Sequence, residues 1–90
     1  MTKRNKLEII KDILKTIKDN HNSIKITPLI RKSNLSTKRF NEYFYELEKK
    51  GFVLKRTNHN DDKVISLTEK GMKYLQKYVN IVGFIEEFDL

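Results

Sequence analysis

The two short helices predicted in the middle of the chain constrain its fold more than any other feature. Thr27 followed by Pro28 predicts a helix start. The threonine oxygen can accept a hydrogen bond from an amide of the first turn, and an N–H at the position of the proline would have no partner inside the helix. Asn34 then predicts a tight turn, and Ser36 caps a second helix over residues 37–50. Two short helices joined by so tight a turn must cross and share one small core.

A β-hairpin is predicted directly after these helices. Gly51 suits the left-handed position that ends a helix. Residues 52–56 and 63–67 are β-prone runs, and the polar residues 57–62 between them form a loop. Helix, tight turn, helix and hairpin, in this order, predict a winged helix-turn-helix.

Further helices are predicted on both sides of this segment. Residues 3–19 repeat apolar side chains at helical spacing, and Thr68 caps a last helix over residues 69–87. Residues 24–26 alternate and predict a short strand beside the hairpin. The expected fold class is therefore α+β: a winged helix-turn-helix of three helices plus a β-hairpin wing, with a long C-terminal helix.

The charge of the chain is unevenly distributed. The formal net charge is +7, from 19 Lys and Arg against 12 Asp and Glu. Residues 1–56 carry 15 basic and 6 acidic side chains, whereas residues 57–90 carry 4 and 6. A basic body favours a polyanionic partner. The alternative is a lysine-rich composition typical of an AT-rich genome, which the many Ile and Asn residues also fit.

Several classes of protein are disfavoured. The chain has no cysteine, and His21 and His59 have no metal-ligand spacing, so neither a metal nor another cofactor is expected. An enzyme is not expected, because no serine has a partnered histidine and the sequence has no glycine-rich phosphate loop. Without a signal peptide or an apolar run of membrane-spanning length, we expect a cytoplasmic, nucleoid-associated protein that does not contact a membrane.

The second helix of the pair carries the predicted DNA-reading face. At about 100° per residue, its apolar side chains fall on one side and its polar ones on the other. Arg, Lys, Asn, Tyr and hydroxyl groups are those that contact base edges and phosphates. The predicted groove contacts are Lys38, Arg39, Asn41 and Tyr45, with phosphate contacts from Arg31 and Ser36. Thr37 is a further predicted DNA-binding residue. The alternative is a solvated helix face, because any surface helix of this chain would be rich in lysine.

The hairpin is predicted to act as a wing that contacts DNA beside this helix. Its basic side chains are Lys55, Arg56 and His59, around a polar tip. A flexible basic loop fits a minor groove or the flanking phosphates, although an ordinary hairpin loop would have a similar composition.

The last helix is predicted to pair with its equivalent in a second chain. Apolar side chains surround most of its circumference, and a domain of this size cannot bury them all. The expected dimer contacts are Met72, Leu75, Tyr78, Val79, Val82, Ile85 and Phe88. The alternative is that the helix packs wholly on its own chain. We therefore expect a DNA-binding domain over residues 1–67 and a dimerisation helix over residues 68–90.

These segments resemble the small basic winged-helix proteins of Sulfolobus and related archaea. The resemblance is carried by residues 33–40 (SNLSTKRF), 50–53 (KGFV), 67–71 (LTEKG) and 84–88 (FIEEF), and it covers nearly the whole chain. It implies a DNA-binding transcriptional regulator or chromatin-type protein that dimerises through the C-terminal helix.

We therefore interpret the chain as a homodimeric transcriptional regulator without catalytic activity that binds specific sequences of double-stranded DNA. Two alternatives remain at this stage. One is an abundant chromatin-type or plasmid-partition protein that binds DNA without regard to sequence. The other is a protein-interaction module, because a fold alone does not determine function.

Overall fold

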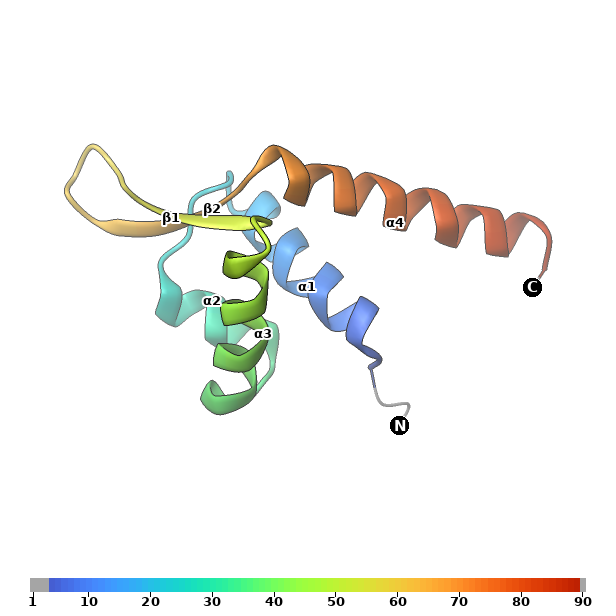
Figure 1. Cartoon of the computed structure of the whole chain (residues 1–90), viewed down its shortest axis with the longest axis horizontal. Coiled ribbons are helices and arrows are strands. Elements are labelled where there is room, and N and C mark those ends of the chain that lie inside the picture. The colour runs from blue at the N-terminus through green and yellow to red at the C-terminus, as the bar shows by residue number, and fades with distance from the viewer. Residues whose placement is uncertain (1–3, 90) are drawn as a thin grey trace.

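The architecture follows the predicted order of elements. The structure, a computed structural model, describes residues 4–89. Its elements are α1 (Lys6–Asp19), α2 (Ile26–Ser33), α3 (Thr37–Lys49), β1 (Val53–Thr57), β2 (Lys63–Leu67) and α4 (Glu69–Glu87). The fold is thus the expected α+β winged helix with a long C-terminal helix. Helices α1, α2 and α3 gather under one end of the hairpin, and α4 leaves this body in the opposite direction from the hairpin loop (Figure 1).

The helix caps predicted from the sequence are formed, with one exception. The Ser36 hydroxyl accepts a hydrogen bond from the Arg39 amide at the start of α3, and Thr68 does the same for Gly71 at the start of α4. Helix α2, however, begins at Ile26, with Lys25 as its cap, rather than after a Thr27 cap. The position of Pro28 does not fix the first residue of α2. The first four amides of a helix have no partner inside it, so proline is tolerated at any position of the first turn.

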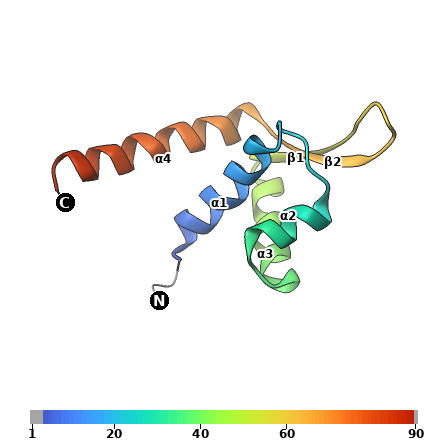
Figure 2. The same cartoon turned by 180° about the vertical axis from the view of Figure 1, so that it is seen from behind.

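A single layer of apolar side chains joins the three N-terminal helices to the hairpin. Ile13, Leu14 and Ile17 of α1 are fully buried, as are Leu29 of α2 and Phe40 of α3. Each comes from the apolar side of its helix, so the 3.6-residue period brings them together. Seen from behind, α1 lies between α4 and the helix pair of α2 and α3 (Figure 2).

The hairpin is antiparallel, with Val53 opposite Leu67 and Thr57 opposite Lys63. Strand β1 begins one residue later than predicted because the Phe52 amide donates to the Leu47 carbonyl at the end of α3, 2.9 Å away. Gly51, with φ of 81°, makes this turn possible. The strand predicted at residues 24–26 is reduced to a bridge between Ile24 and Ile65, since α2 already begins at residue 26.

Helix α4 packs against the body mainly through its first half. Gly71 lies against the Phe52 carbonyl, and Leu75 is buried in the common core. Beyond them the helix extends away, and the molecule measures 48 × 27 × 21 Å along its principal axes. The division into a domain of residues 1–67 and a helix of residues 68–90 stays a prediction.

Candidate nucleic-acid interface

Helix α3 divides into an apolar side and a polar side, as predicted. Phe40, Phe44 and Leu47 are buried, and the rings of the two phenylalanines stack with centroids 5.5 Å apart. This packing fixes the rotation of α3 about its axis. The side chains that it leaves in solvent are Thr37, Lys38, Arg39, Asn41, Glu42, Tyr45, Glu48 and Lys49.

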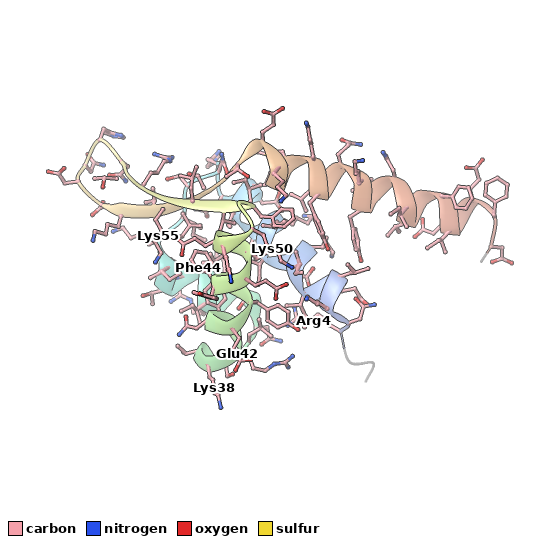
Figure 3. All side chains as sticks on the ribbon, viewed as in Figure 1. Arg4, Lys38, Glu42, Phe44, Lys50 and Lys55 are labelled. Atoms are coloured by element: carbon pink, nitrogen blue, oxygen red, sulfur yellow. The ribbon has the colours of Figure 1, made fainter. Side chains whose placement is uncertain are left out.

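The polar side of α3 is free to meet a ligand. Within residues 4–89, no intramolecular hydrogen bond or ion pair holds the side chain of Lys38, Asn41 or Tyr45. Tyr45 exposes 67% of its surface. Lys38 lies at the end of α3 farthest from the hairpin (Figure 3). The N-terminal half of α3 is therefore open to a ligand.

Arg39 stands apart from these three residues. Its guanidinium lies 5.9 Å from the centroid of the Tyr43 ring, on the side of α3 that faces the start of α1. A shallow hollow there is lined by Lys6, Glu42 and Glu46 as well. Arg39 is still exposed, so its fork of donors remains available at the edge of the polar side.

The hairpin separates the two basic residues that the sequence grouped together. Neighbours along a strand point to opposite faces. Lys55 shares the face of Val53 that covers the core, and its ammonium lies 5.7 Å from the centroid of the Phe44 ring. Arg56 lies on the other face, where its Nε donates to the Ser66 hydroxyl over 2.7 Å. Lys55 is thus beside α3, whereas Arg56 is tied into the hairpin.

The tip of the wing is built by one asparagine. The Asn58 side-chain oxygen accepts hydrogen bonds from the amides of Asn60 and Asp62, 2.9 and 3.0 Å away. Asp62 also lies 3.7 Å from Lys25. His59 is exposed at this tip. The loop is therefore a defined turn that presents a histidine, with Asp62 turned back toward Lys25.

The predicted phosphate contacts surround the start of α3. Arg31 is exposed in the last turn of α2, and Thr37 is exposed at the first position of α3. The oxygen of Ser36 is occupied as a cap acceptor, 3.2 Å from the Arg39 amide. Its hydroxyl proton can still be donated outward.

An ion-pair cluster that the sequence did not reveal borders this face. The Glu46 carboxylate accepts hydrogen bonds from Lys50, 2.8 Å away, and from Lys6, 3.0 Å away. The hydrogen bond from Lys50, and then that from Lys6, lower the pKa of Glu46. The spacing of Glu46 and Lys50 is an ordinary helical pair. Lys6 comes from a different helix, and no local pattern could have identified it.

Arg4 forms a second unforeseen link, which holds the helix pair to α1. Its guanidinium donates to the Asp12 carboxylate over 2.8 Å and to the Ser33 carbonyl at the end of α2 over 3.0 Å. Partial burial works to raise the pKa of Asp12, but hydrogen bonds from Lys11 and Arg4 outweigh it and lower this pKa. Arg4 thus stabilises the turn that leads into α3.

Helix α4 exposes an apolar surface over its outer half. Val79, Ile81, Phe84 and Phe88 each expose more than half of their surface, and the last two rings lie 4.9 Å apart. Of the predicted dimer contacts, Met72 and Ile85 are also exposed, whereas Tyr78 and Val82 are half-buried.

Leu75 departs from this prediction, because it is buried in the core of its own chain. The apolar pattern of α4 therefore serves two surfaces. One packs inward near the start of the helix, and the other faces outward near its end.

A groove of about 380 Å³ runs between α1 and the outer half of α4. Tyr78, Val79 and Val82 form its apolar wall, and the ammonium of Lys11 lies 5.7 Å from the centroid of the Tyr78 ring. The groove continues the exposed apolar surface of α4 onto the body of the protein.

Among the helices of residues 4–89, none has both the length and the apolar character that crossing a membrane requires. The same residues contain no group of three or more His, Cys, Asp or Glu placed to hold a metal ion.

Comparison with known proteins agrees with the fold. The chain is similar to Sso10a-2, described as a DNA-binding protein from Sulfolobus solfataricus, whose crystal structure superposes with a TM-score of 0.72. The two share 25% sequence identity over 94% of this chain and 85% of that one. No curated protein matches the sequence. The sequence pattern of the winged helix-turn-helix family matches residues 3–85, so the chain belongs to that family.

Proposed function

We propose that this protein binds double-stranded DNA as a homodimer, reads its sequence with α3 and so regulates transcription. The observation that carries the proposal is the polar side of α3. It combines exposed Lys38, Asn41 and Tyr45 with a neighbouring wing lysine, Lys55, that is held beside the same helix. This function would place the protein at the nucleoid.

The geometry suits a major groove. The groove is about 12 Å wide and admits one α-helix. The N-terminal half of α3 projects from the body beneath the hairpin, so it can enter the groove while the hairpin stays outside (Figure 1). Lys55 then approaches the phosphates that border the groove, and His59 at the tip reaches farther along the duplex.

We expect the exposed side chains to divide between base contacts and phosphate contacts. The Asn41 amide combines a donor and an acceptor, which match N7 and N6 of adenine, whereas the Arg39 guanidinium offers two donors to O6 and N7 of guanine. Lys38, Tyr45 and the hydroxyls at the start of α3 suit phosphate oxygens, as does Arg31. Arg56 contributes charge with its outer nitrogens, since its Nε is held by Ser66.

A dimer explains the outer half of α4. Exposed Phe84 and Phe88 would be covered if two α4 helices packed against each other in opposite directions. Each protomer would then present one α3 to the same face of the DNA. Such a dimer fits a pseudo-palindrome whose half-sites lie roughly one or two helical turns apart.

The test is binding of the purified protein to DNA from upstream of its own gene, followed by fluorescence anisotropy. A scrambled duplex of equal composition serves as the control, at low and near-physiological salt. We expect tight binding to the native duplex and a large gap to the scrambled one. Equal and strongly salt-dependent binding to both duplexes would contradict sequence-specific regulation and would support a chromatin-type role. If the protein binds neither duplex, DNA binding is wrong and the alternative of a protein-interaction module is supported.

A further inference from the structure

Helix α3 carries three carboxylates: Glu42 and Glu48 are exposed, and Glu46 is half-buried. Glu46 is neutralised by Lys50 and Lys6. Glu42, one turn earlier, has no hydrogen bond or ion pair within residues 4–89. Neither Arg39, whose guanidinium lies 5.9 Å from the centroid of the Tyr43 ring, nor Lys38, four residues before Glu42, forms an ion pair with it. The Glu42 carboxylate is therefore an unpaired negative charge on the surface that we propose as the DNA-binding surface.

Glu42 lies in the part of α3 that projects farthest from the rest of the protein. It is exposed and lies beside Lys38 near the outer end of the helix (Figure 3). Lys38, Glu42 and Tyr45 follow one another at spacings of four and three residues, which places them on one face. If Lys38 and Tyr45 contact DNA, Glu42 between them must face it too.

A carboxylate at this position is selective about what it contacts. An ionised carboxylate only accepts hydrogen bonds, so phosphate oxygens repel it. In the major groove guanine presents only acceptors, and thymine presents an acceptor and a methyl group. Cytosine presents its N4 amino donor without an adjacent acceptor of its own, and acidic side chains accept from it. Glu42 thus gains a partner at cytosine and loses energy at guanine or thymine.

We propose that Glu42 is a specificity-determining residue, which accepts a hydrogen bond from the N4 amino group of one cytosine in each half-site. The inference rests on the proposed DNA-reading function of α3. The carboxylate lowers the affinity of α3 for DNA of any sequence. It lowers the affinity further for half-sites that lack this cytosine. Lys38 and Lys55 supply the attraction to phosphate that offsets the repulsion.

The test is selection of binding sites from a pool of randomised duplexes by three proteins: wild type, Glu42→Gln and Glu48→Gln. The last removes the same charge from an exposed residue at the other end of α3. We expect wild type and Glu48→Gln to select the same cytosine in each half-site. Glu42→Gln should select adenine there instead, because a glutamine amide pairs with the N6 and N7 of adenine.

Affinities for two matched duplexes, measured by anisotropy, make the test quantitative. Replacing the selected cytosine by thymine should weaken wild type and Glu48→Gln about tenfold. The same replacement should leave Glu42→Gln nearly unchanged.

The outcomes separate this inference from the function on which it rests. If Glu42→Gln selects the same sites as wild type and binds every duplex more tightly by one factor, Glu42 only repels DNA and the inference is wrong. The proposed function survives that result. If wild type selects no sequence, both sequence reading and the role of Glu42 are refuted.

Discussion

The ammonium group of Lys55 in β1 lies 5.7 Å from the centroid of the Phe44 ring in α3. Phe44 itself stacks on Phe40 in the core. The position of Lys55 is therefore set by the same packing that sets the rotation of α3. Lys55 lies near Phe44 at the hairpin end of α3, whereas Lys38 and Glu42 lie toward its other end (Figure 3).

Lys55→Ala should weaken DNA binding equally on all sequences. The lysine supplies charge to phosphates and reads no base, so its loss should reduce the salt slope of binding by about one. Anisotropy titrations over a range of salt concentrations measure this. Lys73→Ala, on α4 and away from α3, is the control and should leave the slope intact. A normal slope in Lys55→Ala would remove the wing from the interface.

Glu46→Gln should increase the affinity for DNA and steepen its salt dependence. The glutamate holds Lys50 and Lys6 in hydrogen bonds of 2.8 and 3.0 Å, and glutamine would release both cations beside the polar side of α3. Glu48→Gln removes an equal charge without freeing a lysine pair. If both variants gain affinity to the same extent, the release of the lysines contributes nothing.

Arg4→Ala should lower the free energy of unfolding by about 1 kcal/mol at neutral pH, because charged hydrogen bonds that are partly exposed contribute about this much. Arg4→Lys should recover only part, since lysine lacks the fork that reaches both Asp12 and Ser33. Thermal unfolding monitored by circular dichroism measures the loss. Equal stability of wild type and Arg4→Ala would show that the link contributes nothing.

The contribution of Arg4 should also depend on pH. In the folded protein the pKa of Asp12 lies below its ordinary value of 3.8. The unfolded chain therefore takes up a proton first as pH falls, and the stability from this carboxylate is complete only above that ordinary value. We expect the difference between wild type and Arg4→Ala to shrink as pH falls through the lowered pKa. A difference that stays constant down to that pH would separate Arg4 from the ionisation of Asp12.

Gly71→Ala and Gly83→Ala should change stability in opposite directions. Both lie within α4, where alanine is intrinsically favoured by about 1 kcal/mol. A Cβ at Gly71 would collide with the Phe52 carbonyl oxygen, whereas one at Gly83 meets nothing within 4 Å. We expect Gly71→Ala to cost about 1–3 kcal/mol and Gly83→Ala to stabilise. Chemical denaturation measures both, and a stabilised Gly71→Ala would disprove the close approach.

The double variant Phe84→Ser, Phe88→Ser should be a monomer under conditions where the wild type is a dimer. The two rings expose 56% and 58% of their surface, so their loss should spare the fold of the protomer. Sedimentation velocity measures the oligomeric state. Lys77→Ser, a polar position on the same helix, is the control and should remain dimeric. A monomeric wild type, or a dimeric double variant, would contradict the proposed role of α4.

The bounds of the helices and strands were predictable to within a few residues because their signals are local. Ser36 and Thr68 bond to amides three residues ahead of them, and Gly51 ends α3 through its own backbone angle. Two helix starts were misplaced. Helix α1 begins at Lys6, after an Asn5 cap, rather than at residue 3, which lies outside the described residues. Helix α2 begins at Ile26 rather than at Pro28. There the cap depends on the extended conformation of Lys25, which leads from the bridge at Ile24, rather than on the oxygen of Thr27.

The sequence by itself determined which residues of α3 face the solvent, because helical periodicity and the positions of apolar residues decide that without reference to the rest of the chain. Only the tertiary structure decided how those residues are partnered. Lys6 reaches Glu46 across 40 positions of sequence and Arg4 reaches Ser33 across 29. Leu75 turns inward, while Glu42 keeps its charge unpaired. Such contacts depend on how separate helices pack, and packing energies are set by shape and burial rather than by spacing along the chain.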